Sequence, residues 1–193
     1  MTRLLAKTVC YSIRILHDLN IVHGDLKPDN ILIKKTSLGF SGKLIDFDDS
    51  YFSGNPPTER ECLVGTPEYY SPEQAAYIMD EDEEISGSTL TLKSDIFTLG
   101  IILCEYFTGK KPVLTTGFSS TWSCVDDGKD FWFGKPISKD VALLIKRMLS
   151  LKLEERPTIQ EVFELLKRAK EVPVTDGKPS ILRGKGLIIA NKS

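Results

Sequence analysis

Excess charge is what this sequence of 193 residues most clearly lacks, because 25 lysines and arginines stand against 27 aspartates and glutamates. Sequence-independent binding of nucleic acid needs a basic surface that neutralises phosphates, so we expect no nucleic-acid partner. Long apolar runs are also missing: no stretch approaches the roughly 20 residues of a helix that crosses a bilayer. The first residues turn polar too early for a secretory signal peptide. We therefore expect no membrane partner and a cytoplasmic location.

Cysteine is scarce and its spacing is irregular. The four cysteines, which form no C-x-x-C pair, are Cys10, Cys62, Cys104 and Cys124. This pattern argues against a disulfide framework or a zinc site and favours reduced thiols packed in a core. Internal repeats are missing as well, which argues against a solenoid. A chain of this length is expected to form one domain.

Apolar residues recur at helical spacing in four segments. The segment of residues 95–108 is apolar nearly all round, which predicts a buried helix that stops before Gly109. Ser138 fits the N-cap of the third helix, and Thr158 with Glu161 indicates a capping box at the start of the fourth. His17, in the first helix, is interpreted as a surface or packing residue. The helices are expected at residues 2–20, 95–108, 137–149 and 158–169.

Two short aliphatic runs, residues 31–33 and 43–45, predict a pair of strands. Residues 37–42 carry two glycines and suit the connection of a hairpin. Residues 47–72 form a long irregular stretch, and a loop of this length inside a compact domain is usually functional or disordered. The expected fold class is α+β and mainly α-helical, with a small β-hairpin element.

One cluster of polar residues surrounds the expected hairpin. His-Gly-Asp-Leu-Lys-Pro-Asp-Asn occupies residues 23–30, directly before the first strand, and Asp-Phe-Asp occupies residues 46–48, directly after the second. A hairpin brings its end back beside its start, so Asp25, Asn30 and Asp46 can converge. Phosphoryl transfer needs such a set: one carboxylate deprotonates a hydroxyl, while an amide and a second carboxylate hold Mg²⁺ against phosphate oxygens.

These motifs resemble those of the eukaryotic-type protein kinase family, whose catalytic loop is H-R-D-L-x-x-x-N and whose metal motif is D-F-G. The resemblance implies ATP and Mg²⁺ as cofactors and a protein substrate. It implies Asp25 as the catalytic base and His23 as a buried organiser of the loop. It also implies Asn30 and Asp46 as ligands of Mg²⁺ at the ATP phosphates. Lys27 is similar to the lysine that serine/threonine-specific members place near the transferred phosphate, where its charge offsets developing negative charge.

Aminoglycoside and choline kinases have a similar pair of motifs, H-G-D-x-x-x-x-N and I-D-F/W-x-D, and Gly24 and Asp48 lean toward them. Three later segments favour the protein kinases instead. Residues 65–73 (Gly-Thr-Pro-Glu-Tyr-Tyr-Ser-Pro-Glu) resemble the peptide-binding segment that closes in A-P-E. Residues 94–100 (Ser-Asp-Ile-Phe-Thr-Leu-Gly) resemble the start of the central buried helix, and residues 156–158 (Arg-Pro-Thr) resemble the start of the last helix.

The resemblance implies roles for four further residues. Glu73 and Arg156 would form a buried carboxylate–guanidinium pair that ties the substrate-binding segment to the base of the lobe. Asp95 would accept backbone N–H groups of the catalytic loop and hold that loop rigid. Thr66 would reach the catalytic base and its neighbouring lysine, completing the site that receives the hydroxyl.

The resemblance covers residues 1–170 and matches only the larger, C-terminal lobe of a kinase. No G-x-G-x-x-G loop and no V-A-I-K lysine precede it. We therefore expect the chain alone to be weakly active or inactive, as a fragment whose upstream part supplies the N-terminal lobe. A natural single-lobe protein, or a pseudokinase that acts as an interaction module, is the alternative. The expected boundaries are the catalytic loop 23–30, the metal motif 46–48, the activation segment 46–73, the acidic insertion 80–89, the buried helix 95–108, the last helix 158–169 and a tail or linker 171–193.

The sequence departs from the family pattern in several places. Gly24 stands in the position of an arginine, which predicts activity without a phosphorylated activation loop. Asp48 stands in the position of the metal-motif glycine, and its Cβ predicts reduced switching of that motif. The five acids of residues 80–84 predict a solvated loop, with docking of a basic partner as the alternative. Trp122 and Trp132 predict core packing at least in part, or docking where they are exposed.

Overall fold

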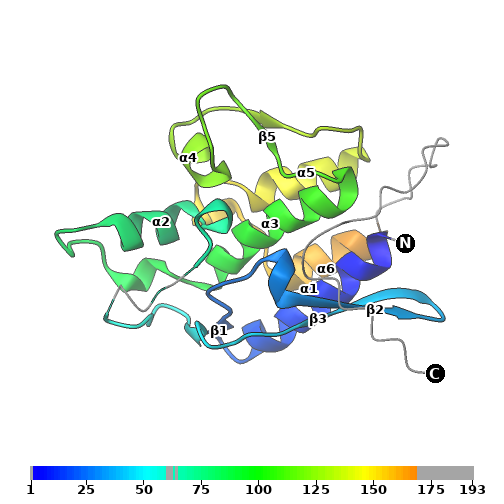
Figure 1. Cartoon of the computed structure of the whole chain (residues 1–193), viewed down its shortest axis with the longest axis horizontal. Coiled ribbons are helices and arrows are strands. Elements are labelled where there is room, and N and C mark those ends of the chain that lie inside the picture. The colour runs from blue at the N-terminus through cyan, green and yellow to red at the C-terminus, as the bar shows by residue number, and fades with distance from the viewer. Residues whose placement is uncertain (1, 60–62, 64, 169–193) are drawn as a thin grey trace.

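Figure 1 shows the computed structural model of the chain, which describes residues 2–59, 63 and 65–168. The described part is mainly helical and contains three two-stranded antiparallel sheets, in agreement with the expected α+β class. The helices are α1 (Thr2–Asp18), α2 (Pro72–Met79), α3 (Leu92–Thr108), α4 (Thr121–Asp126), α5 (Lys139–Met148) and α6 (Ile159–Arg168). The strand pairs are β1 (Ile21–Val22) with β4 (Tyr51–Phe52), β2 (Ile31–Thr36) with β3 (Gly39–Leu44), and β5 (Val113–Leu114) with β6 (Phe131–Trp132). Short 3₁₀ helices cover Pro28–Asn30, Pro67–Tyr69, Gly87–Thr89 and Leu153–Glu155. The tail expected at 171–193 lies outside the described residues.

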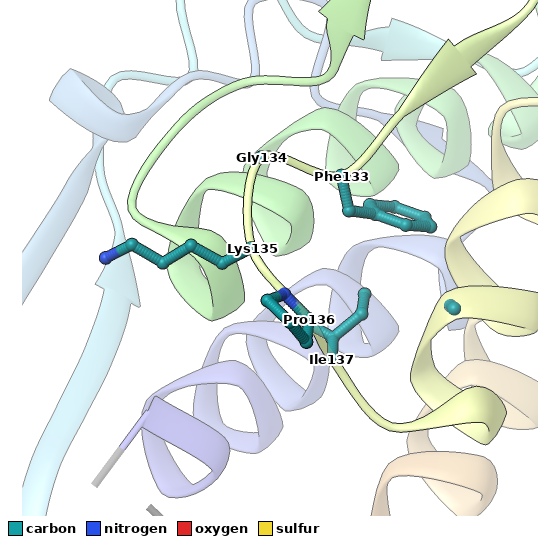
Figure 2. Close-up of a pocket in the computed structure, with 6 residues that line it drawn as sticks. Phe133, Gly134, Lys135, Pro136 and Ile137 are labelled. Atoms are coloured by element: carbon teal, nitrogen blue, oxygen red, sulfur yellow. The ribbon is translucent and has the colours of Figure 1, made fainter. Parts of the chain in front are cut away.

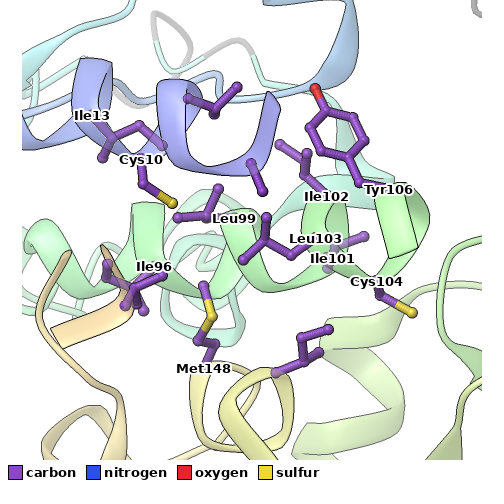
Figure 3. Close-up of a cluster of buried hydrophobic side chains, with 14 of the residues drawn as sticks. Cys10, Ile13, Ile96, Leu99, Ile101, Ile102, Leu103, Cys104, Tyr106 and Met148 are labelled. Atoms are coloured by element: carbon purple, nitrogen blue, oxygen red, sulfur yellow. The ribbon is translucent and has the colours of Figure 1, made fainter. Parts of the chain in front are cut away.

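The helix α3 runs through the centre of the hydrophobic core. Because its side chains are apolar nearly all round, it is stable only when other elements cover every side. Figure 3 shows Cys10 and Ile13 of α1 against one side of α3 and Met148 of α5 against another. The hairpin β2–β3 and the helix α6 pack against the outer sides of α1. This core fixes the base from which the polar loops project.

The hairpin β2–β3 is longer than the sequence predicts. Its strands pair from Ile31 with Leu44 to Thr36 with Gly39, so the connection is only two residues long rather than the expected six of residues 37–42. The prediction was wrong because Gly42 was assigned to a loop. In the structure Gly42 is a strand residue pressed against α1, where a Cβ would lie 2.5 Å from a methyl of Val9.

The expected helix ends shift by a few residues for local reasons. Asn20 has a φ of 60°, and α1 ends at Asp18. The buried helix begins at Leu92, earlier than the expected residue 95, because the hydroxyl of Thr91 accepts the backbone N–H of Lys93 at 3.3 Å and forms the N-cap. Ser138 caps α5 as predicted, accepting the backbone N–H of Val141 at 3.4 Å.

The other two sheets were not predicted. Each consists of strands of two residues, which are too short to produce an alternating pattern in the sequence. The pair β1–β4 matters for the site, since it fastens the segment after residue 46 beside the chain that enters loop 23–30. A second, smaller core cluster lies beneath it, formed by Val22, Tyr51, Leu63, Tyr77 and Leu90. Within the described residues, no helix combines the length and the apolar character needed to cross a membrane.

Candidate active site

Asp25 lies at the centre of the polar cluster, on loop 23–30 between β1 and β2. The residue is 7% exposed, and both oxygens of its carboxylate accept hydrogen bonds. Oδ1 accepts the backbone N–H of Thr66 at 3.2 Å and the hydroxyl of Thr66 at 3.4 Å. Oδ2 accepts Nζ of Lys27 and, at 3.1 Å, Nδ2 of Asn30. These donors balance the cost of burying a carboxylate and hold it in one orientation.

Lys27 joins the two segments on which Asp25 and Thr66 lie. Its Nζ donates to the carboxylate of Asp25 and, at 3.1 Å, to the hydroxyl of Thr66. The side chain is 23% exposed, so the ammonium faces both the buried carboxylate and the solvent. A positive point charge at this place can offset negative charge that develops on a group bound next to Asp25.

Asn30 ties the end of the hairpin back to its start. Its Nδ2 donates to the backbone oxygen of Asp25 at 2.8 Å, and its own backbone oxygen accepts the N–H of Ile45 at 3.0 Å. Ile31, the next residue, pairs with Leu44 in the hairpin. Asp46 therefore leaves the hairpin next to the point where Asn30 enters it. The convergence that the sequence predicts for these motifs is present at the level of the backbone.

Asp46 is exposed and has a φ of 64°, a left-handed conformation that residues with a Cβ adopt rarely. Such backbone strain concentrates at functional sites. The charge around it is strongly negative: partial burial raises the pKa of Asp49 first, and the charges of Asp25, Asp46 and Asp48 raise it further, while Lys27 opposes them. Four carboxylates thus share one region with Lys27, and a surplus of negative charge favours the binding of cations.

The donors at this place fit Mg²⁺ bound to phosphates. Mg²⁺ prefers oxygen ligands and usually takes one or two carboxylates from the protein, while water and phosphate oxygens complete its shell. Asp46 offers a carboxylate without a hydrogen-bond donor among the described residues. Asn30 uses its Nδ2 on Asp25, which leaves its Oδ1 for a cation. Among the described residues no group of three or more His, Cys, Asp or Glu side chains forms a metal cage by itself.

His23 is fully buried, and its backbone rather than its ring holds it in place. Its N–H donates to Oδ2 of Asp95 at 2.9 Å, and its carbonyl accepts the hydroxyl of Ser50 at 3.1 Å. The ring packs against Phe47 with centroids 5.3 Å apart, and neither ring nitrogen has a hydrogen-bond partner among the described residues. The residue therefore links the loop to α3 and to the segment after the hairpin.

Asp95 also binds His17, for which the sequence left a surface role and a packing role open. Nε2 of His17 lies 3.0 Å from Oδ2 of Asp95, and the His17 side chain is buried rather than at the surface. Val9, Ile13 and His17 follow each other at four-residue spacing on the buried side of α1, and this spacing was a usable signal. Thr91 caps α3, so Asp95 is free to face inward toward the loop.

Gly24 brings the segment after the hairpin into direct contact with loop 23–30. Its φ is 84°, and a Cβ at this position would lie 2.1 Å from the backbone oxygen of Asp49. Its own backbone oxygen accepts Nε2 of Gln74 at 2.9 Å, which connects the loop to α2. The residue in the position of the family arginine is therefore a place of close backbone packing, and Gln74 is a contact that no sequence motif indicated.

Glu73 and Arg156 form the expected buried pair between α2 and the segment before α6. Nη1 and Nη2 of Arg156 donate to the two carboxylate oxygens of Glu73 at 2.7 and 2.9 Å. The Arg156 side chain has no exposed surface, and its remaining N–H groups donate to backbone oxygens, among them Ser150 at 2.8 Å and Lys93 at 3.0 Å. This bidentate geometry is the strong form of a carboxylate–guanidinium contact.

The segment that follows Thr66 is supported from the side by an aromatic residue and a cation. Nε1 of Trp122 donates to the backbone oxygen of Pro67 at 3.1 Å, and Nζ of Lys111 lies 4.0 Å from the centre of the Tyr69 ring. Trp122 is thus engaged within the chain. Trp132 is 50% exposed, so the alternative of docking stays open for this residue alone.

The family of this chain is shown by its match to a family model. The model described as "Protein kinase domain" matches residues 1–165. The chain belongs to the protein kinase family. It is 31% identical over 191 residues to the "Ovarian-specific serine/threonine-protein kinase Lok" of Drosophila melanogaster, a match that covers 92% of this chain and 38% of Lok. It is also 31% identical over 163 residues to the "Serine/threonine-protein kinase PSK2" of Saccharomyces cerevisiae, with 84% of this chain and 13% of PSK2 covered.

This kinase chain is much shorter than the relatives that it matches. It spans 38% of Lok and 13% of PSK2, and a match to "Serine/threonine-protein kinase PknB" of Mycolicibacterium smegmatis covers 54% of this chain and 15% of PknB at 33% identity. The family membership of the kinase chain follows from the family model, which matches residues 1–165.

One hollow of the kinase chain lies away from the polar cluster, between β6 and α5. It has a volume of about 390 Å³ and is lined by residues 133–137 together with Ala142. Figure 2 shows the Lys135 side chain pointing away from Phe133 and Ile137, so no charged group enters the hollow from this lysine. None of its lining residues is a candidate for phosphoryl transfer.

Proposed function

We propose that this chain is the C-terminal, catalytic lobe of a serine/threonine protein kinase, which transfers the γ-phosphate of ATP to hydroxyls of protein substrates. The observation that carries the proposal is the single cluster in which Asp25, Lys27 and Thr66 contact one another while Asn30 joins the same carboxylate. Chance turn residues would have no reason to converge from segments 39 residues apart.

In this proposal Asp25 is the catalytic base. Its Oδ1 faces the hydroxyl of Thr66, so a substrate hydroxyl that approaches from the same side can donate to the same carboxylate and lose its proton to it. Lys27 holds the carboxylate in place and offsets negative charge on the transferred group. Thr66 closes the side of the site next to the substrate-binding segment.

Asn30 and Asp46 would hold Mg²⁺, since the oxygen donors that they present suit a cation that also binds phosphates. Bound Mg²⁺-ATP would supply the phosphoryl group and neutralise part of its charge. His23, Asp95 and Glu73 would act as positioning residues through the loop and the pair with Arg156. The side chain of Asp46 is exposed, as expected of a residue that a second, upstream lobe would cover.

The test is phosphate transfer from labelled ATP to a generic protein substrate, with the 193-residue chain and with a version extended upstream. We expect transfer by the extended version and weak or no transfer by the chain alone. Asp25→Asn should lower the rate about 10²- to 10⁴-fold, the range that a general base contributes. Asp140→Asn, a change of the same charge in α5, is the control and should leave the rate unchanged.

A thermal shift separates the alternatives. Binding of Mg²⁺-ATP to the native state should raise the unfolding temperature of the extended version. If Mg²⁺-ATP does not raise the unfolding temperature and no phosphate is transferred, the result favours the pseudokinase or interaction module. Phosphorylation of an aminoglycoside or of choline, with no phosphorylation of protein, would favour the small-molecule kinases.

A further inference from the structure

A groove lies outside the candidate active site, between α1, β3 and α6. Its volume is about 550 Å³. Three lysines line it, Lys7, Lys43 and Lys167, and we call it the lysine groove. Its apolar surface comes from Leu4, Tyr11 and Phe163, and no acidic residue lines it.

The lysines carry a charge that the chain itself only partly neutralises. Lys167 pairs with Glu164 at 3.0 Å. Lys7 and Lys43 have no acidic partner among the described residues. Arg3 lies nearby and directs its guanidinium at the end of α6, where Nε donates to the backbone oxygen of Leu166 at 2.6 Å. The groove is therefore a basic surface that also carries apolar side chains.

The opposite charge lies at the other end of the molecule. The acidic segment, residues 80–84, follows α2, and Figure 1 shows this part of the chain at the far end from the start of α1 and from the β2–β3 hairpin. Asp80 shapes the segment, because its Oδ2 accepts the N–H of Ile85 at 2.6 Å. The four acids that follow are exposed and have no ion pair among the described residues. Met79, directly before the segment, is 55% exposed.

We propose that the lysine groove binds the acidic segment of a second copy of this chain. The two surfaces are complementary in charge, and Met79 beside the acids can contact the apolar side chains beside the lysines. They lie at opposite ends, so they cannot meet within one chain. The contact joins two different surfaces and is heterologous, so the copies associate head to tail.

The physical character of the contact sets its strength. Exposed ion pairs contribute about 0–1 kcal/mol each and are screened by salt. The association should therefore be weak at physiological ionic strength, strengthen at low salt and grow with protein concentration. The proposal does not depend on kinase activity, because it uses none of the residues of the candidate active site.

The test is sedimentation of the full 193-residue chain over a concentration series at about 50 mM and about 500 mM salt, where the screening length differs about threefold. We expect the average mass of the wild type to rise with concentration at low salt, and the apparent Kd to be about tenfold weaker or more at high salt. The groove variant Lys7→Gln/Lys43→Gln and the segment variant Glu81→Gln/Asp82→Asn/Glu83→Gln/Glu84→Gln should each stay monomeric. Lys34→Gln/Lys35→Gln, on the exposed hairpin outside the groove, is the matched control and should associate like the wild type.

Mixing the two variants gives the decisive measurement. The groove variant keeps an intact segment and the segment variant keeps an intact groove, so the mixture should form one-to-one dimers and no larger species. A wild type that stays monomeric at low salt, or a groove variant that still associates alone, overturns the proposal. Binding of a phosphoserine peptide by a chain that does not self-associate, lost in the groove variant, would also overturn it and assign the groove to a phosphorylated partner.

Discussion

Gly24 shows how one residue without a side chain can decide the packing of two loops. A Cβ on residue 24 would lie only 2.1 Å from the backbone oxygen of Asp49, which is too close for any side chain. Ser50, the next residue, donates its hydroxyl to the carbonyl of His23 at 3.1 Å. The segment after the hairpin is thus held on loop 23–30 by backbone contact and one hydroxyl, without a charged side chain at residue 24. Activity without a phosphorylated activation loop stays a prediction, because these contacts concern packing and not phosphate transfer.

We predict that Gly24→Ala destabilises the chain by about 2–5 kcal/mol, the sum of the cost of a left-handed φ and of overpacking. Gly128→Ala is the matched control, because its φ is 66° and nothing lies within 4 Å of its Cβ. The control should lose only the conformational part, about 1–2 kcal/mol. Urea unfolding of both variants measures the difference. Equal losses would mean that Asp49 moves away without cost and that the close packing has no role.

Residues in dense motifs could be placed from the sequence, and residues whose partners are distant could not. Asp25, Lys27 and Thr66 were expected together because a known pattern joins them, and their contacts are present. His17 and Gln74 belong to no such pattern. Their partners lie 78 and 50 residues away, and only the folded chain brings them together.

At the scale of elements, long helices with clear caps were predictable and very short strands were not. The helix α6 has the expected capping box: the carboxylate of Glu161 accepts the backbone N–H of Thr158 at 2.7 Å, and the hydroxyl of Thr158 accepts the N–H of Glu161 at 3.2 Å. The strands β1 and β4 contain two residues each and depend on tertiary contacts. The sequence predicted the β2–β3 hairpin with strands that were too short. Gly42 suggested a turn, but the structure places it within β3, where its close contact with α1 leaves no room for a side chain.

The capping box predicts a dependence of stability on pH. The backbone N–H of Thr158 is the main cause that lowers the pKa of Glu161 from its usual value of 4.5, with the Thr158 hydroxyl and Arg147 adding to it. A carboxylate whose pKa is lowered in the folded chain stabilises the fold at pH values above its usual pKa. It loses this effect as the pH falls through the lowered pKa. We expect Glu161→Gln to cost about 0.3–1 kcal/mol at neutral pH.

The measurement is urea unfolding of the wild type and of Glu161→Gln between neutral pH and pH values below 4.5. The difference between the two should shrink as the wild-type carboxylate takes up its proton. Glu164→Gln makes the same charge change one turn further along α6 and leaves the cap intact, so it serves as the control at neutral pH. A difference between wild type and Glu161→Gln that stays constant down to low pH would contradict a role for the charged cap.

At the scale of the molecule, a buried ion pair connects α2, which contributes to the smaller cluster of apolar residues, with the segment before α6, beside the larger cluster. The larger cluster surrounds α3, and the smaller one lies under α2 and β4. Glu73 belongs to α2, and Arg156 lies on the segment before α6, where the side chain is enclosed by backbone oxygens. Gln74 continues the connection from α2 to the carbonyl of Gly24. We therefore expect the order of loop 23–30 to depend on the pair of Glu73 and Arg156 as well as on its own contacts.

We predict that Glu73→Ala destabilises the chain by about 3–5 kcal/mol, because it leaves the guanidinium of Arg156 buried without its carboxylate. Glu68→Ala is the matched control: it removes the same charge, but Glu68 is in an exposed pair with Lys111 and should cost about 0–1 kcal/mol. Hydrogen–deuterium exchange should show faster exchange in α2 and in loop 23–30 of Glu73→Ala, while α1 and α3 keep their protection. Removing both charges in Glu73→Leu/Arg156→Met should restore most of the stability. Uniform loss of protection in all elements would mean that the chain unfolds as one unit and that this pair does not separate two regions of different stability.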